Sequence, residues 1–140
     1  MDVWRSGGLA VLCVAVVAVG GPACSNGEHA LPSFGHGEAR IQTRSASFDL
    51  ATATGTFDSQ TREVDGTWTG QGRTFTVFGP ARVGAYPTSD RFVVTLDGTG
   101  GFSSDDGSCT VQVARADSEG VAGAFDCRTG GVSGSFTLAP

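Results

Sequence analysis

A five-residue pattern occurs four times in this chain and constrains its fold more than any other feature. In each copy a small apolar residue is followed by any residue, a glycine, a small residue and an aromatic residue. The copies cover residues 53–57, 64–68, 121–125 and 132–136. Side chains alternate between the two faces of a strand, so the apolar residue, the glycine and the ring of each copy share one face. The pattern therefore predicts β-strands that bury one face.

If the last two copies pair as an antiparallel hairpin, an aromatic ring lies over each of their glycines. A glycine inside a strand weakens it unless a neighbouring side chain fills the gap. Closing the hairpin over residues 128–131 sets Phe125 opposite Gly134 and Gly123 opposite Phe136. Each ring then lies over the facing glycine, an arrangement that repairs glycines in strands.

The first two copies predict a second hairpin of the same kind. Closing it over residues 60–63 sets Phe57 opposite Gly66 and Gly55 opposite Trp68. The expected exchange of ring and glycine is the same as in the last hairpin.

The whole segment from residue 39 to residue 140 has the character of a β domain. The chain contains 22 glycines, and β-rich segments alternate with clusters of turn residues. The predicted strands are residues 40–43, 46–57, 64–70, 74–78, 91–96, 108–115, 121–127 and 132–138. We therefore predict an all-β fold, a single antiparallel β-sandwich or open barrel of about 7–8 strands.

The N-terminus carries an export signal rather than a part of the fold. Residues 9–19 are apolar, which is too short to span a bilayer and typical of the core of a signal peptide. Residues 21–24 resemble a bacterial lipobox, which Ala23 and Cys24 match, whereas Gly21 and Pro22 depart from its usual form. The resemblance implies that residues 1–23 are removed and that the Cys24 thiol carries a lipid, with further acyl chains such as palmitate. Plain secretion and a retained membrane helix are the alternatives.

Residues 24–38 predict a flexible tether between the lipid and the domain. They contain Gly, Pro, Ser and charged residues without an apolar period. The two histidines of the chain, His29 and His36, lie in this segment. No third ligand stands at a suitable spacing, so we expect both to be solvated and predict no metal site.

The cysteines of the chain predict one disulfide. Cys13 leaves with the signal peptide and Cys24 is acylated, so Cys109 and Cys127 remain as a pair in an exported domain, where disulfides persist. Setting Cys109 opposite Cys127 also places Val111 opposite Phe125, which gathers both sulfurs and apolar side chains on one face. Plain secretion would instead leave Cys24 as an odd thiol.

Residues 107–113, 121–127 and 132–136 resemble the C-terminal half of small uncharacterised bacterial lipoproteins with a disulfide-containing β-sandwich-like domain. The resemblance covers the last quarter of the chain and the lipobox. It implies an architecture and no catalytic residues.

All nine basic residues of the chain are arginine, which suggests a GC-rich genome.

The sequence predicts no enzyme, no cofactor and no nucleic-acid partner. The net charge is −5 and the arginines are scattered, without a basic stripe. Nucleophilic catalysis needs a base beside Ser or Cys, but both histidines lie in the tether. Asp105 and Asp106 are typical of a turn. Together with Asp97 they offer too few oxygen ligands for calcium.

Residues 79–90 form the segment that most favours recognition. It is a long predicted loop with Arg82 and the single tyrosine, Tyr86. Loops on a rigid scaffold often bind partners, and Tyr with Arg is a common make-up of contact patches. The alternative is that Tyr86 packs down and the loop only closes one end of the domain.

Three classes of function follow. The first is a non-catalytic lipoprotein, anchored to the extracytoplasmic face of the cell membrane, with a structural role or with an envelope protein or glycan as partner. The second is a carrier of a lipid or another hydrophobic ligand in a cavity between the sheets. The third is an enzyme with a cleft of perturbed carboxylates. The scarcity of clustered titratable groups favours the first.

Overall fold

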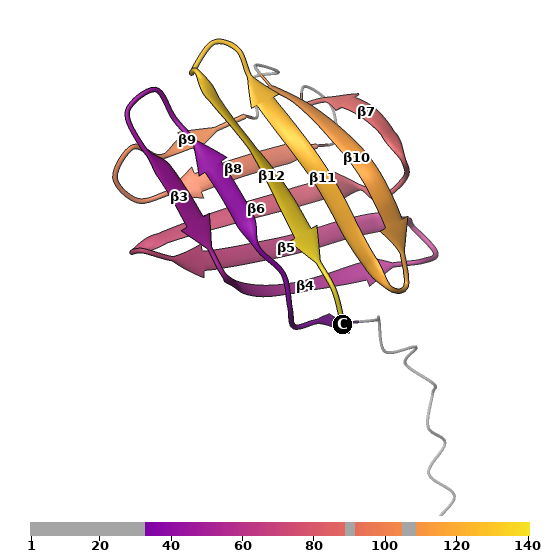
Figure 1. Ribbon diagram of the computed structural model, residues 1–140. Coiled ribbons are helices and arrows are strands. Elements are labelled where there is room, and N and C mark those ends of the chain that lie inside the picture. The colour runs from indigo at the N-terminus through magenta and orange to yellow at the C-terminus, as the bar shows by residue number, and fades with distance from the viewer. Residues whose placement is uncertain (1–32, 89–91, 105–108) are drawn as a thin grey trace, which may run out of the picture.

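The computed structural model describes residues 33–88, 92–104 and 109–140, which form two six-stranded antiparallel sheets packed face to face (Figure 1). The fold is a β-sandwich, as predicted, and the sheets do not close into a barrel. The strands are β1 (Ser33–Phe34), β2 (Ala39–Gln42), β3 (Ser47–Leu50), β4 (Thr52–Asp58), β5 (Glu63–Gly70), β6 (Arg73–Pro80), β7 (Gly84–Pro87), β8 (Val93–Asp97), β9 (Phe102–Ser103), β10 (Cys109–Asp117), β11 (Gly120–Cys127) and β12 (Val132–Leu138).

Each sheet is built around three consecutive strands. The first sheet has the order β1-β4-β5-β6-β8-β9, and the second has the order β3-β2-β12-β11-β10-β7. The strands of the second sheet run diagonally across those of the first (Figure 1). The short strands β1, β9, β3 and β7 form the four edges.

Aromatic side chains from both sheets fill the space between them. The ring of Phe75 in the first sheet lies 5.2 Å from the ring of Phe125 in the second. Trp68 lies 5.4 Å from Phe75 and 5.5 Å from Phe136, and its indole N–H donates to the carbonyl oxygen of Thr137 at 3.0 Å. These rings are almost fully buried, so the single core joins the two sheets.

Both registers predicted for the second sheet are confirmed. Phe125 lies opposite Gly134 and Gly123 opposite Phe136 in the β11–β12 pair. In the β10–β11 pair, Cys109 lies opposite Cys127. The repeated pattern therefore places ring over glycine as expected.

The register predicted for the β4–β5 hairpin is wrong by two residues. Phe57 lies opposite Val64, and Gly55 lies opposite Gly66. The space beside Gly66 is filled from its own strand and from the other sheet, because atoms of the Trp68 ring and of the Leu138 side chain lie 2.7 and 2.8 Å from the position of a Cβ added to Gly66. A slip of two residues leaves every side chain on its predicted face.

The turn between β4 and β5 explains the difference. The strands separate at the Asp58–Glu63 pair, and a carboxylate oxygen of Asp58 accepts the backbone N–H of Gln60 at 2.7 Å and of Thr61 at 3.1 Å. An Asp side chain that bonds the backbone two and three residues ahead stabilises a turn over residues 59–62, which has the predicted length but begins one residue earlier than we predicted.

The predicted strand over residues 46–57 is broken into β3 and β4, which belong to different sheets. Leu50 and Ala53 are both buried. Residues three apart on one strand face opposite sides, so a break at Ala51 is needed to bring both side chains into the core.

The described domain begins before the predicted end of the tether. β1 pairs with β4, and Phe34 is buried. The backbone N–H groups of Gly35 and His36 both donate to the carbonyl oxygen of Ala139 at 3.1 Å. The side chain of His36 is exposed. Residues 33–38 thus belong to the sandwich, and the chain enters it beside its C-terminus (Figure 1).

Candidate functional site

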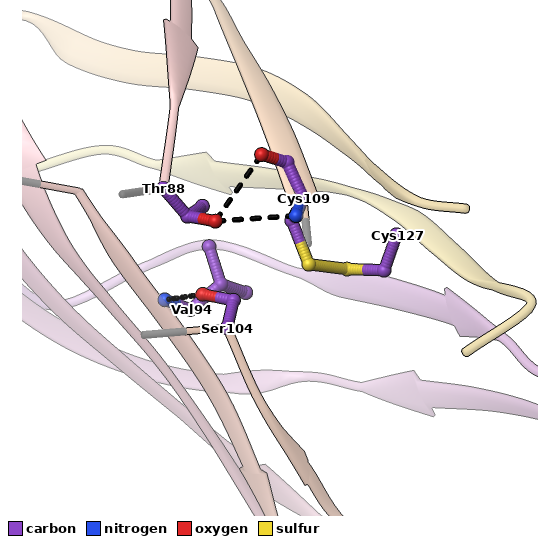
Figure 2. Close-up of a disulfide and its surroundings, with 5 residues drawn as sticks. All are labelled: Thr88, Val94, Ser104, Cys109 and Cys127. Atoms are coloured by element: carbon purple, nitrogen blue, oxygen red, sulfur yellow. Dashed lines mark hydrogen bonds between the residues drawn. A yellow bond between two sulfur atoms is a disulfide. The ribbon is translucent and has the colours of Figure 1, made fainter. Parts of the chain in front are cut away.

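The predicted disulfide is present between Cys109 and Cys127. Both residues are buried, and their Cα atoms lie 4.0 Å apart on neighbouring strands. The hydroxyl group of Thr88 accepts the N–H of Cys109 and donates to its carbonyl oxygen, each at 3.2 Å (Figure 2). The N–H of Thr88 also donates to that carbonyl oxygen at 3.1 Å. Thr88 therefore fastens the start of β10 beside the disulfide.

A second buried hydroxyl lies near the disulfide. Ser104 is fully buried, and its side-chain oxygen accepts the N–H of Val94 at 2.7 Å (Figure 2). Its own N–H donates to the carbonyl oxygen of Val94 at 3.0 Å. Because both hydroxyl groups form hydrogen bonds with the backbone, they have the features of residues that stabilise the fold.

The structure places Tyr86 against the domain. Residues 84–87 form the edge strand β7, which pairs with β10. The Tyr86 ring stacks on Phe92, with centroids 5.7 Å apart, and its hydroxyl donates to the carbonyl oxygen of Arg82 at 3.0 Å. The side chain of Arg82 is exposed, as is that of Val83. Residues 79–90 were considered either as a recognition loop or as a loop with Tyr86 packed against the domain, and Tyr86 is packed.

Several predicted features lie outside the described residues. These are the anchor Cys24, His29 and the Asp105–Asp106 pair. Within the described part, no three His, Cys, Asp or Glu side chains are close enough to hold a metal ion. That part also has no helix of the length and apolarity needed to cross a membrane.

A groove that the sequence did not predict opens at one end of the sandwich. The β2–β3 turn at residues 43–46 and residues 99–101 of the β8–β9 loop form its walls, together with Gly130 of the β11–β12 turn. Phe48, Phe102 and Val132 contribute apolar surface. The groove has a volume of about 470 Å³, within the range of small-molecule sites. We call it the arginine groove, because Arg44 and Arg73 also line it.

Arg73, the first residue of β6, is held in place by neutral partners. Its Nε and Nη2 atoms donate to the carbonyl oxygen of Thr99 at 3.3 and 3.1 Å. Its Nη1 atom donates to the carbonyl oxygen of Gln71 at 3.1 Å. The guanidinium carbon lies 3.8 Å from the centre of the Phe48 ring, a cation–π contact. The orientation of the charge is therefore fixed before any ligand arrives.

Arg44 reaches the groove from the second sheet. It lies in the β2–β3 turn, where the hydroxyl oxygen of Thr43 accepts the N–H of Ala46 at 3.0 Å. The Arg44 side chain lies against the backbone of Gly131, in the place that a Cβ there would occupy. Gly131 has φ +62°, a conformation that favours glycine. The glycine thus allows both the turn and the position of Arg44.

The charges of the groove are not balanced among the described residues. Neither Arg44 nor Arg73 forms an ion pair with a described residue, whereas Arg40 pairs with Asp49 and Arg115 pairs with Asp117. None of the described residues that line the groove is acidic. The groove therefore has a local positive charge on a chain whose net charge is −5.

Among the described residues, two carboxyl groups have shifted pKa values, and both lie outside the groove. Hydrogen bonds from the N–H groups of Thr61 and Gln60 lower the pKa of Asp58 below its ordinary value of 3.8. The hydrogen bond from Arg115 lowers the pKa of Asp117, and the same pair raises the pKa of Arg115. A catalytic acid needs a raised pKa, so these two groups have the properties of turn and surface ion-pair residues.

Sequence reasoning missed the arginine groove because its residues come from different sheets. Arg44 and Arg73 are far apart in the chain, and only the packing of the sheets brings their turns together. The available signal was weak: each arginine stands in a short gap between two predicted strands. Comparison with known proteins gives no match, since no family model, no curated protein and no solved structure matches this chain.

Proposed function

We propose that this protein is a non-catalytic lipoprotein, anchored through Cys24 to the extracytoplasmic face of the cell membrane, whose β-sandwich has a structural or binding role. The observation that carries this proposal is the apolar run at residues 9–19 followed by the lipobox-like residues 21–24. The buried disulfide supports it, because such bonds persist in exported proteins.

The path of the chain suits a domain held from one end. The described chain begins at Ser33 and passes Ala139 at Gly35 and His36. β2 then runs from Ala39 to Gln42 and leads into the turn that forms one wall of the arginine groove. The C-terminus lies at one end of the sandwich, and the β2–β3 turn lies at the other (Figure 1). A lipid on Cys24 would thus be attached on the side of the domain away from that turn. The groove would then face away from the membrane and would be accessible to partners in the envelope.

A binding role at the surface is better supported than the carrier of a hydrophobic ligand. A carrier needs an apolar void between its sheets. Here Trp68, Phe75, Phe125 and Phe136 occupy that space, with neighbouring ring centroids between 5.2 and 6.5 Å apart. A carrier would need these rings to move apart and open a cavity, and no described residue favours such a rearrangement.

The intact mass of the protein in the membrane fraction of its host tests the proposal. The expected mass is that of residues 24–140 plus acyl chains, with a gain of two hydrogens on reduction. The variant Cys24→Ser should lose the acyl mass and leave the membrane fraction. An unlipidated mass of the unmodified chain in the culture medium would contradict the anchor.

A further inference from the structure

We propose that the arginine groove binds an acidic sugar, a saccharide residue with a carboxylate or phosphate group. This inference deepens the proposed function, since the envelope location makes glycans available as ligands. Three features of the groove favour such a ligand: its charge, the fixed position of Arg73 and its aromatic and polar lining.

The charge of the groove selects an anion. Two guanidinium groups line it, and neither has a carboxylate partner among the described residues. Arginine presents its N–H donors in a planar arrangement that matches carboxylate and phosphate oxygens. Because the described lining has no acidic side chain, an anionic group there would meet attraction without a competing internal partner.

The position of Arg73 lowers the entropic cost of binding. Three of its N–H groups are occupied by the carbonyl oxygens of Thr99 and Gln71. A guanidinium group has five N–H donors, so two remain for a ligand. The side chain already lies on Phe48 and loses little freedom when an anion binds.

The rest of the lining suits a sugar ring. Phe48 and Phe102 are half-buried and offer apolar surface beside the charges, and the C–H faces of a pyranose pack on such surfaces. Ser45 lies in the wall formed by the β2–β3 turn, and Gly100 and Gly101 keep the wall formed by the β8–β9 loop free of bulky side chains. A few polar groups placed around apolar surface are typical of ligand sites.

Titration calorimetry with the purified full-length mature protein tests the proposal. Trigalacturonate and glucose 6-phosphate are the acidic probes, and the methyl ester of trigalacturonate is the neutral one. We expect at least one acidic probe to bind, the neutral ester to bind much more weakly, and added salt to weaken binding. Binding of neither acidic probe overturns the proposal, as does equal binding of the ester.

A pair of charge-matched variants locates the site. Arg44→Gln removes an exposed guanidinium from the groove and should weaken binding about tenfold or more. Arg82→Gln makes the same change of charge just beyond the far end of β6, a strand whose length from Arg73 to Pro80 is about 23 Å, and should leave binding unchanged. Circular dichroism checks that both variants are folded. Loss of binding in Arg82→Gln alone would assign recognition to residues 79–90 and overturn the groove.

Two further measurements distinguish a sugar ligand from a peptide ligand, and a failure of the groove proposal from a failure of the anchor proposal. If hexaglutamate binds as tightly as trigalacturonate and is also weakened by Arg44→Gln, the site recognises acidic peptide and the sugar assignment is overturned. For these measurements the protein is purified from the membrane fraction or from the culture medium, whichever contains it, and its lipidation is determined from its mass. An unlipidated protein that binds would contradict the anchor and leave the groove standing, whereas a lipidated protein that binds no acidic probe would contradict only the groove.

Discussion

The ring of Phe125 occupies the space beside Gly134, the residue directly opposite it in the β11–β12 pair. A Cβ added to Gly134 would lie 2.7 Å from the nearest atom of that ring and would also meet the carbonyl oxygen of Arg40 on the other side. The ring of Phe136 has the same relation to Gly123, at 2.6 Å. These glycines are therefore required by close packing rather than by turn geometry.

The variant Gly134→Ala should be markedly less stable. Its methyl group cannot fit without moving Phe125 or the β2 backbone, and overpacking of this kind costs about 1–3 kcal/mol. Urea denaturation followed by tryptophan fluorescence measures the loss in the free energy of unfolding. Trp68 lies in the same core and reports the transition.

Gly130→Ala is the control for this prediction. A Cβ at Gly130 would meet only a methyl group of Val132 at 3.6 Å, an ordinary contact. Its stability should stay within about 0.5 kcal/mol of the unmodified protein. Equal losses in the two variants would show that the cover of Phe125 over Gly134 is not the cause.

The registers of the second sheet were predicted from two constraints, each acting on a different pair of strands. The glycine–aromatic pattern fixes the β11–β12 register, and the cysteine pair fixes the β10–β11 register, with Phe125 and Cys127 on the same face of β11. In the β4–β5 hairpin the pattern is again the only constraint, and there it is wrong by two residues. A slip of two residues preserves every face, so the hydrogen bonds of Asp58 in the turn decided the register, and the pattern alone does not contain them.

The edges and the groove were harder to predict for a different reason. β1 and β7 are short and contain few apolar residues, and their backbone pairing with β4 and β10 defines them. The arginine groove depends on how the two sheets pack, which brings the turns of Arg44 and Arg73 to one end. Local sequence patterns carry no information about that packing angle.

Removal of the disulfide should destabilise the domain without unfolding it. The bond joins residues 18 positions apart, and on the chain-entropy model a loop of this size contributes about 3 kcal/mol. The core rings and the hydrogen bonds of Thr88 remain in the reduced protein. Denaturation with and without a reductant measures the difference, and a reduced protein of equal stability would contradict the expected contribution.

Thr88→Val should destabilise the same region by a separate route. The hydroxyl that bonds both the N–H and the carbonyl oxygen of Cys109 is lost, while the shape of the side chain is kept. Loss of a buried hydrogen-bonding group costs about 1–3 kcal/mol. Amide exchange at the start of β10 should increase most. Thr110→Val, at an exposed position of β10, serves as the control and should not increase that exchange.

Asp58 should make stability depend on pH in the acid range. Its folded-state pKa is lowered by the N–H groups of Thr61 and Gln60, so its stabilising contribution is present above its ordinary pKa of 3.8. The contribution is lost as the pH falls through the lower folded-state value. The stability difference between the unmodified protein and Asp58→Ala should therefore shrink as the pH falls below 3.8. Ser59→Ala, an exposed neighbour, should show no such pH-dependent difference.

Gly131 links the stability of the β11–β12 turn to the arginine groove. With φ +62°, Gly131→Ala places an L-residue in the left-handed region at a cost of about 1–2 kcal/mol, and its Cβ meets the side chain of Arg44. Both stability and affinity for the acidic probe should fall. Gly131→Asn separates the two effects, because Asn tolerates this conformation but still displaces Arg44. We expect near-normal stability and weakened binding in calorimetry, and a Gly131→Asn protein that binds the probe normally would show that the placement of Arg44 against Gly131 does not support the site.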